Sequence, residues 1–581
     1  MNAVVILLVG IAVLFIGYVT YGKWLAKEWG IDETKTTPAH VLQDGRDYVP
    51  AKAPVLMGHH FSSIAGAGPI NGPIQAAVFG WVPVLLWVLI GGIFFGATHD
   101  FGALFASIRN KGQSIGEVIS NSMGVRAKRL FIIFSYLTLV LVVAAFASIV
   151  ANTFMATYDE TGAVDIAASS ANATTAMISI LFIVVAVLFG IFVYRRNAPL
   201  GIASVIGVTA IIVCMIIGLN WHPLYLSQPT WMIIVGIYIT VASVTPVWIL
   251  LQPRDYLSSF LLYGMMVVAI VGILATGITG NANLEIPAFT GFIDSASHGS
   301  GVSLGALFPA LFVTIACGAI SGFHSLVGSG TTAKQLNNER DARPIAYGGM
   351  LIECALAVVS LCAVGFVWKQ YVPGGITTPT AVFAVGISEM CATLPVLEGA
   401  KDVIYALLIL AVSAFCLTSL DTATRLARYM FQEFWVKPGE SIDELKGARK
   451  VLVNPLVATI ITVVAGVALG MTGYAKIWPL FGAANQLLAA LGLMAVATWL
   501  GKIGRNNKML FIPMAFMLIV TIVSLVMTIR VKFAAWMAGD VWAALLVVLG
   551  VLLIVLAIVL AVEGVNTMKK QKAFKTAVKA E

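Results

Sequence analysis

The chain has 581 residues, of which 59% are hydrophobic and 11% charged, and its formal net charge is +8. Soluble domains carry about 25% charged residues, so this composition excludes a soluble globular protein and a disordered one. Six cysteines in so long a chain give no disulfide scaffold. Apolar runs recur from end to end and predict an all-α polytopic membrane protein.

The apolar runs are long enough to be transmembrane helices, which need about 20 residues each. Fourteen of them are clear, at 3–22, 84–108, 130–156, 175–195, 199–219, 231–252, 256–279, 304–324, 345–368, 402–428, 451–470, 476–500, 511–530 and 540–563. A fifteenth stretch, 61–80, is apolar but contains several glycines and two prolines.

The distribution of Lys and Arg decides whether 61–80 crosses the membrane. If it crosses, 30 of the 35 basic residues fall in loops on one side, which is then the cytoplasmic side. If it does not, only 25 do. We therefore expect about 15 transmembrane helices in a plasma membrane, with the N-terminus outside and the C-terminus inside. Basic residues confined to short loops also argue against nucleic acid as a partner.

The stretch 61–80 predicts a helix that is broken within the membrane. Three glycines and two prolines lie close together between Ala65 and Pro73. Proline removes a backbone donor and glycine allows the chain to unwind. Irregular backbone at this depth must be buried in protein or line a cavity. The alternative is a proline kink at a helix contact.

A second interruption is expected within 231–252, where Ala242–Pro246 contains a proline. The two interrupted spans would run in opposite directions, each opening a group of five. Such pairs indicate an inverted-repeat transporter with its site near the midplane. The expected organisation has four parts: an N-terminal span and cytoplasmic loop (1–60), two repeats (61–219 and 220–430), and peripheral C-terminal spans with a basic tail (431–581).

Four motifs resemble those of the carbon starvation protein A (CstA) family. They are Gly58–Pro73, Gly96–Phe101, Gln252–Leu257 and Leu420–Arg425. The resemblance implies an inner-membrane transporter of bacteria or archaea, in the amino acid–polyamine–cation superfamily, with a LeuT-like core. It also implies uptake of peptides during carbon starvation, or of pyruvate with protons.

The polar residues near the two interruptions are the candidate substrate site. Exposed amides at the ends of half-helices favour anions, so a carboxylate of a peptide or of pyruvate would fit there. Histidine beside the break could also hold an anion, although simple interfacial polarity explains it equally well. The candidates are His60, Ser62, Ser63, Gly66, Gly68, Asn71, Gln75 and Thr245.

Ionisable residues within the spans are the candidates for ion coupling, because charges there are costly and are usually functional. Glu353 has no basic residue at helical neighbour spacing, so it could carry a proton or simply donate a hydrogen bond between helices. His99 and Asp100 form an adjacent acid–base pair. Thr314 and Ser321 could instead help to hold Na⁺, and the sequence does not separate H⁺ from Na⁺.

Two charged pairs near the cytoplasmic ends of spans are candidate gates. Asp421 and Arg425 are four residues apart and share a helix face. Arg254 and Asp255 follow the second expected interruption. For both pairs, a structural ion pair that fixes the inner end of the span is the favoured interpretation, and a gate is the alternative.

The predicted function is secondary active uptake of small carboxylate-bearing nutrients, coupled to an H⁺ or Na⁺ gradient. No Walker A motif occurs in the chain, and no enzyme activity or cofactor is expected. His59, His60, His99 and His324 are possible metal ligands, but no HExxH pattern pairs two of them, so no metal site is expected. The alternatives are an ion channel, which needs repeated filter sequences, and a membrane-embedded enzyme.

Overall fold

The computed structural model describes residues 2–580, apart from 46, 197, 295–302, 373, 377, 438–439 and 441–443. Within this part of the chain, helices dominate, and the strands β1 (Thr157–Tyr158) and β2 (Val164–Asp165) form one short antiparallel hairpin. The all-α class predicted from the composition is confirmed.

The N-terminal half contains the following helices in chain order. They are α1 (Ala3–Gly17), η1 (Tyr18–Gly22), α2 (Lys23–Trp29), α3 (Pro38–Val41), α4 (Ala53–Ile64), α5 (Gly68–Ala76), η2 (Ala77–Phe79), α6 (Trp81–Ile90), η3 (Gly91–Gly96), α7 (Ala97–Arg109), α8 (Ile115–Met123), α9 (Val125–Phe154), α10 (Ile166–Gly190), η4 (Ile191–Arg195), α11 (Leu200–Asn220), α12 (Gln228–Val244) and α13 (Leu251–Ile278).

The C-terminal half continues in the same manner. Its helices are α14 (Leu307–Thr314), α15 (Gly322–Gly330), η5 (Thr332–Lys334), η6 (Glu339–Asp341), η7 (Arg343–Gly348), α16 (Gly349–Phe366), α17 (Trp368–Tyr371), α18 (Pro379–Ala392), α19 (Pro395–Glu398), α20 (Lys401–Trp435), α21 (Ala448–Leu452), α22 (Pro455–Gly470), α23 (Tyr474–Lys502), η9 (Lys508–Leu510), α24 (Phe511–Met537) and α25 (Val541–Ala580).

Eleven helical segments of the described residues are long and apolar enough to cross a membrane. Three shorter apolar helices, α12, α18 and α22, fall below that length. A multi-pass membrane protein is therefore confirmed, whereas the expected number of fifteen crossings is not established by this criterion. In α23, every residue of the 18-residue apolar stretch that qualifies it as a span is buried, whereas in α11 only 22% of that stretch is buried. Helix α23 therefore lies inside the bundle and α11 at its periphery.

The first expected interruption is present. Helix α4 ends at Ile64 and α5 begins at Gly68, so Ala65, Gly66 and Ala67 link two half-helices. Pro69 lies in the first turn of α5, where its missing N–H costs no helical hydrogen bond. Pro73 is inside α5, so the irregular backbone is shorter than the Ala65–Pro73 stretch that the sequence suggested.

The second expected interruption is present as a helix end that separates two whole helices, not two half-helices. Helix α12 ends at Val244 rather than running through 231–252, and a separate helix, α13, begins at Leu251. Proline at 246 terminates a helix here because the residue before it is driven out of the helical conformation. The second interrupted helix is instead in the expected span 304–324, where α14 ends at Thr314 and α15 begins at Gly322.

The two interruptions lie against each other. A Cβ placed on Gly68 would be 2.4 Å from Cys317 Cβ, and one on Gly72 would be 2.7 Å from the Thr314 carbonyl oxygen. Glycine is therefore required at both positions of α5 for the close approach of the second interrupted segment. This contact brings together two parts of the chain that are more than 200 residues apart in sequence.

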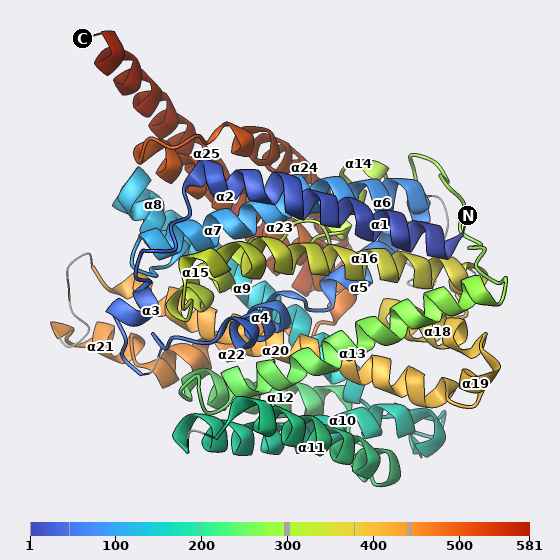
Figure 1. Ribbon diagram of the computed structural model, residues 1–581. Helices are drawn as coiled ribbons and strands as arrows, with labels where there is room; N and C mark the ends of the chain where they lie inside the picture. The colour runs from blue at the N-terminus through green and yellow to red at the C-terminus, as the bar shows by residue number, and fades with distance from the viewer. Residues whose placement is uncertain are drawn as a thin grey trace.

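The remaining helices surround this pair (Figure 1). Helix α9 packs along α20 and also contacts α22 and α23, while α16 contacts α5. The α10–α11 hairpin lies at one side of the bundle and α24–α25 at the opposite side, where the end of α25 projects from the body (Figure 1). Helices α4, α5 and α15 are thus largely buried among other helices, whereas α14 lies at the edge of the bundle.

Candidate functional site

A chain of four buried ionisable residues lies beside the second interruption. His324 of α15 places Nδ1 2.8 Å from Asp100 Oδ2 and Nε2 3.5 Å from Glu353 Oε2. His99 Nδ1 is 2.8 Å from the other Asp100 oxygen. All four side chains are at most 2% exposed. The adjacent pair His99–Asp100 was predicted, whereas the link from Asp100 through His324 to Glu353 was not.

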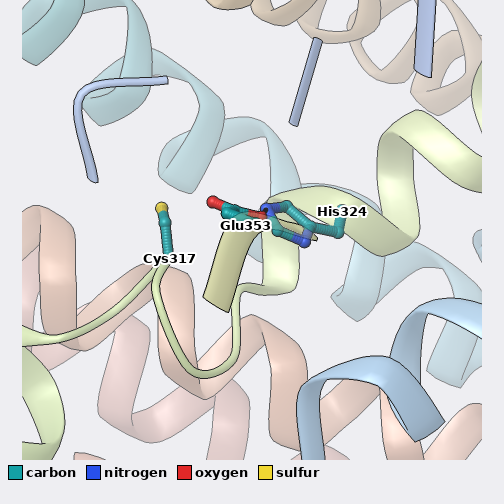
Figure 2. Close-up of side chains that lie close together, drawn as sticks. All are labelled: Cys317, His324 and Glu353. Atoms are coloured by element: carbon teal, nitrogen blue, oxygen red, sulfur yellow. Dashed lines mark ion pairs between the residues drawn. The ribbon is translucent and has the colours of Figure 1, made fainter. Parts of the chain in front are cut away.

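Several atoms of this cluster have no hydrogen-bond partner within the described residues. They include His324 Nε2 and both carboxyl oxygens of Glu353. Cys317, in the interrupted segment, lies on the far side of Glu353 from His324, and its thiol points toward the Glu353 carboxyl group (Figure 2). Glu353 has no basic neighbour on its own helix, but His324 approaches it from α15. Helical spacing alone could not predict this contact.

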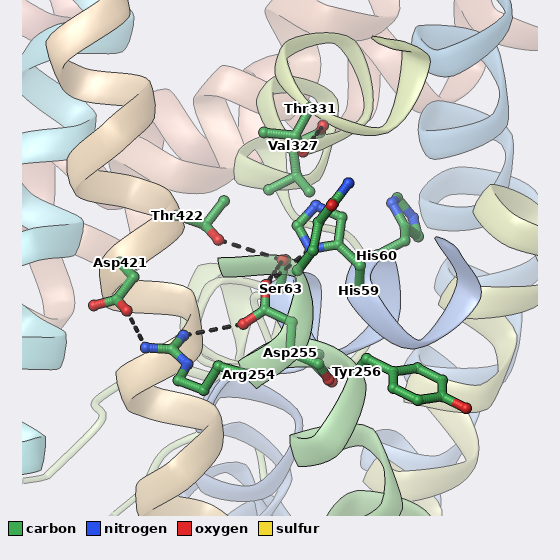
Figure 3. A network of polar contacts seen from close by, with 12 residues as sticks. His59, His60, Ser63, Arg254, Asp255, Tyr256, Val327, Thr331, Asp421 and Thr422 are labelled. Carbon is green, nitrogen blue, oxygen red and sulfur yellow. Dashed lines mark hydrogen bonds and ion pairs between the residues drawn. The ribbon is translucent and has the colours of Figure 1, made fainter. Parts of the chain in front are cut away.

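A second polar network joins α4, α13 and α20 (Figure 3). Arg254 forms ion pairs with Asp421 and, at 3.0 Å, with Asp255. The Tyr238 hydroxyl donates to Asp421 Oδ2 at 2.8 Å. His59 Nδ1 lies 2.8 Å from Asp255 Oδ2, which extends the network to the first interrupted helix. The network therefore ties together four helices, α4, α12, α13 and α20, and its charged groups are buried.

The expected pairing of Asp421 with Arg425 is wrong. Asp421 pairs with Arg254, and the Arg425 guanidinium donates to the Ala242 carbonyl oxygen at 2.8 Å and to the Thr245 carbonyl oxygen. These carbonyls end α12 and lack helical partners, so a cation there is favourable. Thr245 is consequently part of a helix end, and its carbonyl oxygen accepts from Arg425.

Ser62 and Ser63 fix the end of α4 against the Arg254–Asp421 network. The Ser62 hydroxyl donates to the Asp255 carbonyl oxygen at 3.0 Å. The Ser63 hydroxyl is 3.5 Å from Asp255 Oδ2 and 3.3 Å from the Thr422 hydroxyl. Two predicted substrate residues, Ser62 and Ser63, and three predicted gate residues, Arg254, Asp255 and Asp421, therefore belong to one connected region.

His60, in α4, and Gly66, in the link between α4 and α5, have neighbours outside the Arg254–Asp421 network. His60 Nδ1 is 2.8 Å from the Thr332 hydroxyl, and its Nε2 has no hydrogen-bond partner among the described residues. A Cβ on Gly66 would lie 2.9 Å from Phe146 Cζ and 3.1 Å from Ser419 Oγ. The first interruption is closely packed in this conformation.

Asn71 and Gln75 point to a different set of partners. The Thr380 hydroxyl of α18 donates to Asn71 Oδ1 at 3.2 Å, and Gln75 Nε2 donates to the Tyr474 hydroxyl of α23 at 2.8 Å. These contacts hold α5 to α18 and α23. Asn71 and Gln75 are therefore separated from Ser62 and Ser63 by the interruption itself.

Two side chains from α23 form hydrogen bonds with the second interrupted segment. The sequence did not indicate these contacts. Asn485 Oδ1 accepts from the Phe323 amide at 2.9 Å, and its amide donates to Ser321 Oγ at 3.0 Å. Gln486 Nε2 donates to the Ile315 carbonyl oxygen at 3.3 Å. Thr314, half-buried at the end of α14, contributes its carbonyl to the contact with α5.

Buried ionisable groups around two interrupted helices, in a multi-pass membrane protein, are typical of a secondary transporter. The chain belongs to the carbon starvation protein CstA family, whose sequence pattern matches residues 2–374 and 372–524. The resemblance noted in the motifs is thereby confirmed over most of the chain.

The chain is similar to characterised bacterial proteins over nearly its full length. It is 34% identical to the peptide transporter CstA of Bacillus subtilis, over 89% of each protein. It is 32% identical to the pyruvate/proton symporter BtsT of Escherichia coli, over 90% of this chain and 81% of the relative. These relatives are transporters rather than enzymes.

A solved structure of a manganese transporter variant from Eremococcus coleocola aligns with 91% of this chain and 99% of that protein, with 12% identity and a TM-score of 0.47.

Proposed function

We propose that the protein is a secondary active transporter that imports short peptides or pyruvate by alternating access. The observation that carries this proposal is the contact between the two interrupted helices, which meet at Gly68 and Cys317 and are surrounded by buried polar groups. Interrupted membrane helices create substrate and ion sites because their free backbone groups can bind ligands. The names of the relatives supply the two substrate classes.

The substrate would bind through its carboxylate at the inner ends of the half-helices. Helix α5 begins at Gly68 and α15 begins at Gly322, so the N-terminal ends of both face the interruptions. Helix N-termini favour anions through their amides and dipoles. Peptides and pyruvate share a carboxylate, so this recognition fits both.

The coupling ion is proposed to be a proton. Glu353, His324 and Asp100 form a continuous buried series of groups that can gain and lose protons. Ser321, one of the two hydroxyls considered for Na⁺, is already bonded to Asn485. The arrangement therefore favours H⁺ over the Na⁺ alternative.

The Arg254–Asp421 network is proposed to be the inner gate. It joins α4 to α13 and α20, so an inward opening of α4 would separate His59 and Ser63 from Asp255. Asn71 and Gln75, on the other half-helix, would separate from α18 and α23 in an outward opening.

The inverted repeats are proposed to be α4–α5, α6–α7, α9, α12, α13 and α14–α15, α16, α20, α22, α23. Helix α13 contacts the first interrupted helix, α18 and α20, while α23 contacts the second interrupted helix, α8 and α9, as such symmetry requires. This division replaces 61–219 and 220–430 and makes α10–α11 an insertion.

The two interrupted helices, α12, α22 and the eleven long segments would give fifteen crossings in a bacterial or archaeal inner membrane, with the N-terminus outside.

Reconstitution tests this function. Proteoliposomes without ATP should accumulate labelled pyruvate or a labelled di- or tripeptide only under an imposed proton gradient. Competition between pyruvate and peptides would identify the preferred substrate. Equilibration independent of any gradient would indicate a channel, and chemical conversion of the substrate would indicate an enzyme.

A further inference from the structure

The cluster of Cys317, His324 and Glu353 has the composition of a transition-metal site. One ligand atom from each residue, a thiol sulfur, an imidazole nitrogen and a carboxyl oxygen, lies within 4.8 Å of the other two. All three residues are buried. Zn²⁺ is bound in proteins by this mixture of sulfur, nitrogen and oxygen ligands, and three protein ligands leave one position open.

The free atoms of the cluster are the ones that a metal ion needs. His324 Nδ1 and His99 Nδ1 both face the Asp100 carboxylate, so each Nδ1 donates its hydrogen there. In neutral His324 this places the lone pair on Nε2, which has no hydrogen-bond partner within the described residues. A carboxylate behind a histidine ligand is the usual support of such sites.

The spacing also fits. His324 Nε2 and Glu353 Oε2 are 3.5 Å apart. Two ligand atoms of a tetrahedral ion with bonds of about 2.0–2.2 Å lie roughly 3.3–3.6 Å apart. The distance between His324 Nε2 and Glu353 Oε2 already falls in this range. Cys317 belongs to the interrupted segment between α14 and α15, and its thiol faces Glu353 (Figure 2).

We propose that Cys317, His324 and Glu353 bind a Zn²⁺-like divalent ion, with Asp100 as the positioning residue behind His324. The ion joins the second interrupted segment to α16. Its ligands are the thiolate of Cys317, the imidazole of His324 and the carboxylate of Glu353. This binding does not depend on which nutrient the protein transports.

Co²⁺ binding to the purified full-length protein tests the site, because a thiolate ligand produces a sulfur-to-cobalt charge-transfer band. The wild type should bind one Co²⁺ with that band and release it to Zn²⁺. Cys317→Ser should lose the band and weaken binding at least about tenfold. Asp100→Asn should keep the band but weaken binding about 10–100-fold.

Cys362→Ser is the matched control, since Cys362 is a buried free cysteine of the same helix as Glu353 and contacts the Ala3 carbonyl oxygen. It should leave binding unchanged. The proposal is overturned if the wild type gives no charge-transfer band, or if Cys317→Ser retains it. Should Cys317→Ser fail to fold, slower alkylation of wild-type Cys317 in Zn²⁺, measured by peptide mass, supports the site, and an unchanged rate contradicts it.

Discussion

Arg254 of α13 forms an ion pair with Asp421 of α20, and both side chains are 1% exposed. A charge in such a position depends on its partner, because removing one member leaves the other unpaired in a medium of low polarity. The Tyr238 hydroxyl donates a hydrogen bond to Asp421. Arg254 also pairs with Asp255, which in turn contacts His59. The stability of the proposed inner gate is therefore concentrated in a few buried charges.

We predict that Asp421→Asn destabilises the protein by about 3–5 kcal/mol, because it leaves Arg254 with one carboxylate instead of two. The change should appear as a lower unfolding temperature in detergent. Glu285→Gln is the control: it breaks the exposed pair between Glu285 and Lys369, whose atoms are 2.8 Å apart, and should cost about 0–1 kcal/mol. Equal losses in the two variants would show that the buried pair has no special role.

We predict that Glu353→Gln abolishes accumulation driven by a proton gradient but preserves exchange of substrate across the membrane. Gln keeps the size of the side chain and cannot change its protonation state. Transport assays in proteoliposomes, with and without an imposed gradient, measure both activities. Glu389→Gln, at the ion pair of Glu389 with Lys401 in α18 and α20, should retain coupling. Accumulation at the wild-type level in Glu353→Gln would remove Glu353 from the mechanism.

The sequence indicated the first interrupted helix because its prolines and glycines act locally, through missing donors and unrestricted backbone. It did not indicate the second one, since residues 315–321 contain no proline and a single glycine. That interruption is maintained by Asn485 and Gln486, which come from a helix more than 150 residues later. A break that depends on tertiary hydrogen bonds leaves little trace in its own sequence.

In the candidate site too, contacts between neighbours in the chain could be predicted, whereas contacts between helices could not. His99 and Asp100 are adjacent in the chain, so their contact was predictable, and so was the functional interest of Glu353. The partners Arg254 for Asp421 and His324 for Glu353 come from other helices. Helical spacing favoured Arg425 for Asp421, but the unpaired carbonyls at the end of α12 bind Arg425 instead.

We predict that Gly68→Ala impairs both stability and transport. The added Cβ would lie 2.4 Å from Cys317 Cβ, and overpacking of this kind costs about 1–3 kcal/mol. Transport and unfolding temperature should both fall, and a second change, Cys317→Gly, should restore part of the loss. Gly264→Ala is the control, because no atom of the described residues lies within 4 Å of its added Cβ and alanine favours the helix by about 0.5–1 kcal/mol. Unimpaired transport in Gly68→Ala would argue against close contact of the interruptions.

Zn²⁺ should inhibit transport if the metal site and the proposed coupling route share Glu353. A bound ion would hold the interrupted segment of Cys317 to α16 and would occupy the carboxylate that carries the proton. Transport by wild-type proteoliposomes should fall as Zn²⁺ is added and recover with a chelator, while Cys317→Ser should need at least about tenfold more Zn²⁺ for the same inhibition. Cys362→Ser should behave as the wild type. Equal sensitivity of the wild type and Cys317→Ser would place the inhibitory metal elsewhere, and intact transport in a Zn²⁺-loaded protein would show that the bound ion leaves the coupling route free.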